Sequence, residues 1–160
     1  MIKTWLLTSV LALAPLSELR GAIPYAYLNG VPLWAAALVA TAINACIPFL
    51  GFFFFRHLHK FFLKMNWYRR YFEKQAAKSE RKVKEKIQKY GLWGLMVFVG
   101  IPLPMTGAWT GVIGAFILGL DEKKSTLSII LGVLIAGCIV TAVLYTGSSV
   151  ASLFTKTINI

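Results

Sequence analysis

Glu18 and Arg20 are the charged residues best placed to do chemistry in this chain, since they stand two apart between two apolar runs. A charge inside a bilayer costs about 2.5–3.5 kcal/mol even on the more permissive scale, so such residues are usually paired or functional. A carboxyl group withdrawn from water disfavours its charged form, which lets it exchange protons near neutral pH. We expect Glu18 to carry a proton and Arg20 to form an anion site. Alternatively, Glu18 pairs with Arg20 or caps the half-helix that follows it.

Uncharged polar groups gather in a second interruption of the apolar pattern, at residues 100–111. Hydroxyls, free amides and one indole N–H are available there, as either the wall of a polar pocket or loop packing. Two prolines two residues apart cannot lie inside a regular helix, so they set the shape of the break. The expected substrate- and proton-binding residues of both breaks are Glu18, Arg20, Gly21, Pro24, Pro102, Pro104, Thr106, Gly107, Trp109 and Thr110.

Catalytic and metal-binding patterns are missing from the sequence. No nucleophile elbow, phosphate loop or zinc-hydrolase spacing occurs, and Glu18 has no partner for intramembrane catalysis. Cys46 and Cys138 lie in apolar runs without metal-ligand spacing, so we expect them to pack. His57 and His59 lack an acidic or cysteine partner and are read as interfacial. We therefore expect no enzyme activity, no metal and no cofactor.

The composition is typical of an integral membrane protein. Hydrophobic residues make up 58% of the chain and charged residues 14%, against roughly 45–50% and 25% in soluble domains. Of 17 Lys and Arg, twelve fall between Arg56 and Lys89. A Lys and Arg excess marks cytoplasmic loops, so the net charge of +11 points to anionic lipid headgroups and not to nucleic acid. We expect a multi-pass protein of the inner (cytoplasmic) membrane.

The apolar segments alternate between broken and continuous. Each half of a broken segment is roughly 9–12 residues, so about 14–18 Å as a helix, or half of a hydrocarbon core of about 30 Å. The expected fold is all-α and has three parts. Residues 1–55 form a first membrane repeat (re-entrant hairpin 5–28, transmembrane helix 33–55), residues 56–91 a basic amphipathic cytoplasmic or interfacial helical linker, and residues 92–160 a second repeat (hairpin 92–120, transmembrane helix 126–147).

Short matches support two copies of one unit. Residues 15–17 match 102–104, residues 20–22 match 106–108, and residues 45–47 match 137–139. Placing both the linker and Lys123-Lys124 in the cytoplasm requires each broken segment to enter and return. The halves are then inverted repeats with both termini outside, although a spanning second broken segment stays open. Breaks at matched positions are the best sequence indication of a transport site near the midplane.

Residues 16–24 and 102–111 resemble the putative small multi-drug export protein family, over nearly the whole chain. That family is similar to the wider DedA superfamily. The resemblance implies two facing re-entrant hairpins and transport. In DedA relatives, acidic and arginine residues near the hairpins matter, proton dependence is inferred, and members are implicated in returning undecaprenyl phosphate across the membrane. Glu18 and Arg20 are the matching residues, whereas Thr106 stands where an arginine is expected.

The function expected from these features is secondary transport, coupled to protons and exporting lipophilic cations or small drugs. One alternative is DedA-like flipping of a lipid phosphate such as undecaprenyl phosphate, and another is a non-transporting membrane scaffold. So small a chain needs a second copy to seal a pathway, so we expect a homodimer. The other expected partners are membrane lipids at the basic segment and protons, with no nucleic acid.

Overall fold

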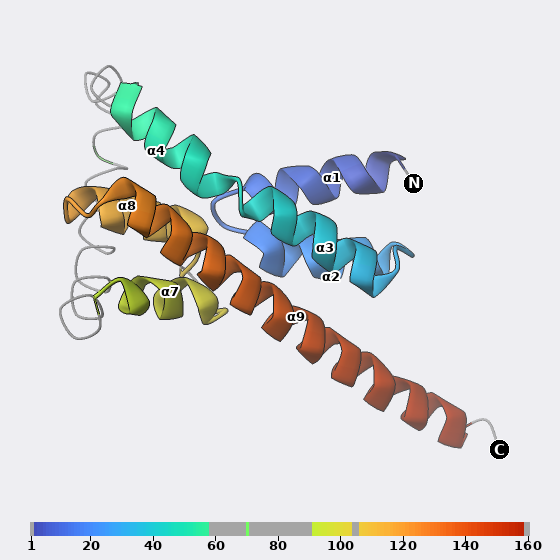
Figure 1. Cartoon of the computed structure of the whole chain (residues 1–160). Helices are drawn as coiled ribbons and strands as arrows, with labels where there is room; N and C mark the ends of the chain where they lie inside the picture. The colour runs from blue at the N-terminus through green and yellow to red at the C-terminus, as the bar shows by residue number, and fades with distance from the viewer. Residues whose placement is uncertain (1, 58–69, 71–90, 104–105, 159–160) are drawn as a thin grey trace.

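The protein is helical throughout the part that the structure describes. The computed structural model describes residues 2–57, 70, 91–103 and 106–158, and the last eleven of these as backbone alone. No strand occurs in these residues, which confirms the all-α expectation. The helices are α1 (Ile2–Leu13), α2 (Glu18–Leu28), α3 (Leu33–Asn44), α4 (Ile47–His57), α7 (Leu92–Gly100), α8 (Ala108–Ile117) and α9 (Glu122–Ile158) (Figure 1).

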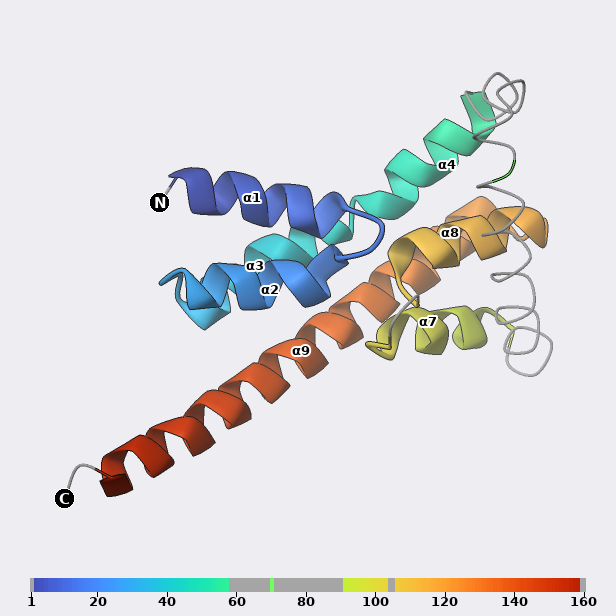
Figure 2. The same ribbon diagram turned by 180° about the vertical axis from the view of Figure 1, so that it is seen from behind.

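Two pairs of short helices each fold back on themselves. The turn between α1 and α2 holds Pro15, and α7 and α8 are joined by the extended residues around Pro102. At 12, 11, 9 and 10 residues, these helices have the half-bilayer lengths that the sequence predicts. Seen from both sides, the α1–α2 pair opens toward the N-terminus and the α7–α8 pair opens the opposite way (Figures 1 and 2). The turns of the two pairs face each other beside α9.

The apolar run at 33–55 is interrupted, although the sequence predicts one transmembrane helix there. The structure divides it into α3 and α4, with the break at residues 45–46. Pro48 explains the position, since it has no N–H to donate to the Asn44 carbonyl and its ring crowds that group. Together the two helices cover 25 residues and are long and apolar enough to cross a bilayer, as is the 122–147 part of α9.

Helix α9 begins four residues before its predicted start at residue 126 and continues beyond residue 147. The early start follows from Asp121, whose carboxylate accepts a hydrogen bond from the Lys124 amide at 2.9 Å and caps the first turn. Helix α4 likewise extends past residue 55, and Arg56 forms an ion pair with Glu122 that joins the two helices. Apart from residues 56–57, 70 and 91, the predicted basic linker lies outside the described residues.

Small side chains fill much of the inside of this fold, and large apolar side chains cover much of its surface. Alanine is common among the buried residues, and large apolar side chains are common among the exposed ones. Small residues let helix backbones approach closely, as in membrane proteins, where apolar surface can face lipid without cost. Examples are Ala12, Ala22, Ala36, Ala40 and Ala108 inside, and Trp34, Phe49, Phe53, Trp93 and Leu127 outside.

Candidate functional site

Glu18 joins the two helix pairs. It is the first residue of α2 and only 6% exposed, yet its carboxylate accepts hydrogen bonds from the backbone amides of Ala108 and Trp109, each at 3.2 Å. These are the first two residues of α8, whose amides have no partner within their own helix. A carboxylate there also meets the positive end of the helix dipole. Glu18 therefore caps a helix 90 residues away in sequence.

This contact differs from both of the local roles considered for Glu18. The capped helix is α8 and not α2, which Glu18 itself begins. Among the described residues, Arg56 and Glu122 form an ion pair, whereas Glu18 and Arg20 do not. Glu18 also has a positive φ of 50°, which costs a residue other than glycine about 1–3 kcal/mol. The surrounding contacts must hold it in that conformation.

Gly107 allows the approach of α8 to Glu18. It is buried and directly precedes α8. A Cβ atom at this position would overlap the Glu18 carboxylate. Gly21 is constrained in a similar way, because a Cβ there would overlap the Ser17 hydroxyl in the first turn.

Arg20 holds the chain between α7 and α8. Its guanidinium group donates hydrogen bonds to the carbonyl oxygens of Leu103 and Thr106, and to the Thr106 hydroxyl at 3.1 Å. The Leu103 carbonyl also accepts the Thr106 amide at 3.2 Å. The fork of Arg20 supplies a further donor to it and a donor to the Thr106 carbonyl, both of which lie in the break of the helix. The Thr106 hydroxyl in turn reaches the carbonyls of Ile101 and Leu103 at 2.8 and 2.9 Å.

Two further side chains cap the end of α1. The Trp109 indole N–H donates to the Leu13 carbonyl at 2.8 Å, and the Asn44 amide donates to the Ala12 carbonyl at 2.8 Å. The last carbonyls of a helix lack internal donors, so both bonds satisfy groups that the turn exposes. The Asn44 contact is a hydrogen bond between helices of the kind that polar side chains form inside apolar segments. The two turns thus cap each other's helices.

A small cavity lies beside these contacts. It leaves no room for a water molecule. Two buried polar atoms in its lining, Nε of Arg20 and Oδ1 of Asn44, have no hydrogen-bond partner. Unpaired buried groups cost about 1–3 kcal/mol each, which favours any rearrangement that pairs them. The lining residues are Glu18, Leu19, Arg20, Asn44, Val99, Val133 and Ala136.

The structure brings together most of the predicted site. Glu18, Arg20, Thr106, Gly107 and Trp109 form one connected set, as described above. The Thr110 hydroxyl donates to the Gly107 carbonyl at 3.1 Å, and Pro102 lies in the loop that Arg20 holds. Pro24 lies inside α2, more than one turn past Glu18. Pro104 lies outside the described residues.

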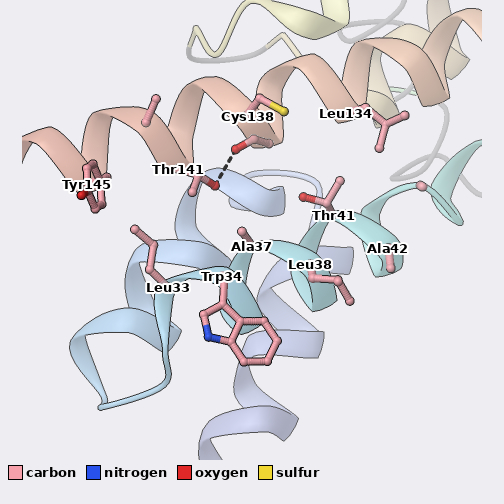
Figure 3. A pocket seen from close by; sticks show the side chains of 13 residues that line it. Leu33, Trp34, Ala37, Leu38, Thr41, Ala42, Leu134, Cys138, Thr141 and Tyr145 are labelled. Atoms are coloured by element: carbon pink, nitrogen blue, oxygen red, sulfur yellow. Dashed lines mark hydrogen bonds between the residues drawn. The ribbon is translucent and has the colours of Figure 1, made fainter.

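A much larger apolar groove of about 920 Å³ runs between α3 and α9 (Figure 3). Thr41, Cys138 and Thr141 are among the few polar side chains in its lining, and the Thr141 hydroxyl donates to the Gly137 carbonyl at 2.7 Å. Ala45 lines this groove and directly follows Asn44, which lines the small cavity. In the same way, Ala136 lines the small cavity and the next residue, Gly137, lines the groove.

One known family matches this chain. The model of the putative small multi-drug export protein family covers residues 18–139. The chain belongs to that family. No curated protein and no solved structure matches the sequence.

Membership of an export family and the two long apolar helices both indicate a membrane protein. The matched region begins at Glu18 and contains every side chain that joins the two turns. Sequence reasoning missed the groove between α3 and α9. Its lining residues are mostly apolar and form no motif, and only the tertiary fold brings the two helices together. Sequence reasoning also missed the capping of α8 by Glu18, for which no spacing rule exists over 90 residues.

Proposed function

We propose that this chain is a small secondary exporter of lipophilic cations, in which Glu18 carries the coupling proton. The observation that carries the proposal is the carboxylate of Glu18 at the α8 N-terminus, where it joins the two helix pairs. A titratable group that links two halves can couple proton binding to their separation. The family description as an export protein supports the transport part of the proposal.

The mechanism follows from the hydrogen bonds of Glu18. Protonation removes its negative charge and turns one carboxylate oxygen into a donor, so the amides of Ala108 and Trp109 lose charge-assisted bonds. The attraction to the helix dipole is lost at the same time. The helix pairs then separate at their turns, and the unpaired acceptor on Asn44 in the same cavity can accept the new O–H of Glu18.

The arrangement in the membrane belongs to the same proposal. We place 1–55 and 92–160 as inverted repeats with re-entrant pairs 5–28 and 92–120, both termini outside and residues 56–91 against anionic lipid headgroups inside. The opposite openings of the two helix pairs support this arrangement (Figure 2). So does the contact between Arg20 and Thr106, which stand at matched positions of the two halves. A homodimer would complete the pathway.

The groove between α3 and α9 is the proposed site for the apolar body of the substrate. It is open, almost wholly apolar and separated from the cavity of Glu18 by adjacent residues of two helices (Figure 3). Lipophilic cations partition into the bilayer, so a groove on the lipid side gives them access. The charged end would then approach Glu18 once the turns separate, and the positive charge beside the carboxyl group would favour release of its proton in exchange.

The two native cysteines test this groove. Both are exposed, but only Cys138 lines the groove, so Cys46 is the matched control. We expect ethidium to slow the reaction of Cys138 with a lipophilic maleimide severalfold in vesicles and to leave Cys46 unchanged. The measurement is the labelling rate of each cysteine in the Cys46→Ser and Cys138→Ser variants. Equal protection of both cysteines, or of neither, would remove the groove from the proposal.

Transport itself is tested with purified protein in liposomes that contain a pH-sensitive dye. Under an imposed pH gradient, addition of ethidium is expected to start proton movement in vesicles with protein and not in vesicles without it. The Glu18→Gln variant is the negative control. If ethidium moves no protons with the native protein, drug export fails.

A membrane scaffold is the second candidate, and the joined turns favour it. Every hydrogen bond described for Glu18 and for the terminal nitrogens of Arg20 goes to another part of the chain, as a purely structural cluster requires. Flipping of a lipid phosphate in the manner of DedA relatives has less support, because those Arg20 nitrogens already hold carbonyl groups. A scaffold would move no protons in the liposome experiment and would depend on Glu18 for stability alone.

A further inference from the structure

A second groove, separate from the site above, lies between α7 and the first turns of α9. It encloses about 240 Å³. Its walls are apolar apart from a hydroxyl and one ammonium group, that of Lys124. The lining residues are Leu92, Trp93, Met96, Lys124, Leu127, Ser128 and Leu131.

The charge of this groove is at one end. Lys124 lies in the first turn of α9, and Leu127 and Leu131 follow on the same helix face at i+3 and i+7. The distance from Lys124 to Leu131 along the helix is about 10 Å at 1.5 Å per residue. The groove therefore has a cationic end at the polar start of α9 and an apolar floor that runs into the span.

The side chains around the groove suit the boundary between headgroups and hydrocarbon. Trp93 is 71% exposed and Leu127 is 60% exposed, so the groove opens outward to the surroundings of the protein. Tryptophan is enriched at that boundary in membrane proteins. Lys124 lies at the end of a helix long enough to span, where a cation reaches phosphate groups.

The acidic residues near Lys124 are engaged elsewhere. Glu122 is paired with Arg56, and a carboxylate oxygen of Asp121 accepts the backbone amide of Lys124. Within the described part of the chain, the ammonium group of Lys124 takes part in no ion pair. Lys124 is exposed and lines the groove, which leaves its ammonium group able to bind an anion.

We propose that this groove binds one anionic phospholipid, with the phosphate at Lys124 and the start of an acyl chain along Leu127 and Leu131. The charge at one end and the apolar floor match the two parts of such a lipid. The proposal does not depend on transport. It also differs from a general attraction of the basic segment for headgroups, because it names one lysine and one groove.

The test uses the full-length protein in phosphatidylcholine vesicles that contain phosphatidylglycerol with brominated acyl chains. Bromine quenches tryptophan at close range, and Trp93 lines the groove. We expect stronger quenching by brominated phosphatidylglycerol than by brominated phosphatidylcholine at equal mole fraction. The difference should disappear in Trp93→Phe. Lys124→Ala should lower the apparent preference for phosphatidylglycerol about fivefold, which corresponds to one surface lysine.

Lys123 provides the matched control, because it is exposed on the adjacent position and does not line the groove. Lys123→Ala should retain the preference for phosphatidylglycerol, and Lys124→Arg should restore most of it. Equal losses in Lys123→Ala and Lys124→Ala would show diffuse attraction and overturn the proposal. A difference between the two brominated lipids that persists in Trp93→Phe would place the lipid elsewhere and overturn the proposal as well.

Discussion

Proton-coupled flux is expected to disappear when Glu18 is replaced by glutamine, while the protein stays folded. Glutamine has the same shape but cannot release or bind the coupling proton. Its oxygen can still accept one of the two α8 amides, whereas its NH₂ group would face the other. The loss of one charge-assisted bond lowers the free energy of unfolding by about 1–3 kcal/mol. The measurements are dye-reported flux in liposomes and unfolding in detergent.

The control for this prediction is Glu122→Gln, the same substitution at an exposed acid in an ion pair with Arg56. Exposed pairs contribute about 0–1 kcal/mol, so we expect near-native flux and stability. Native flux in Glu18→Gln would contradict the coupling role. If both variants lose flux equally, the loss results from removing any negative charge and not from breaking the contact between Glu18 and α8.

Local patterns predicted most of the secondary structure. Apolar runs interrupted by proline and glycine gave both pairs of short helices, and the all-α class followed from the same pattern. The break at residues 45–46 was not predicted, since residues 33–55 were expected to form one transmembrane helix. The start of α9 was placed too late because Glu122 and the lysines after it are polar, although Asp121 caps them into the helix.

The candidate site was predictable in part. The cost of a charge among apolar residues identified Glu18 and Arg20, and the second break identified Thr106, Gly107 and Trp109. Their mutual contacts depend on how two distant turns meet, and no spacing within one segment encodes that. Pro24 was included because it lies near the first break in sequence, but it lies inside α2, more than one turn past Glu18.

The second large effect is expected from Gly107→Ala. Its backbone is extended, with φ of 160°, so conformation alone does not require glycine. The added methyl group would overlap the Glu18 carboxylate. Either the Glu18 carboxylate moves and leaves the two α8 amides unpaired, or α8 moves away from it. Both changes lower the free energy of unfolding, because the contact is buried. We expect the free energy of unfolding to fall by about 2–5 kcal/mol and flux to be lost.

Gly147→Ala is the matched control, because the residue lies in α9 and a Cβ there has no neighbour within 4 Å among the described residues. Alanine should leave stability unchanged or raise it by up to about 1 kcal/mol. A double-mutant cycle then isolates the contact. If the methyl group acts by displacing Glu18, Gly107→Ala should cost much less in a Glu18→Ala background, since the space is already free. Additive costs would mean that Gly107 supports the fold through other neighbours and that the joined turns do not depend on this approach.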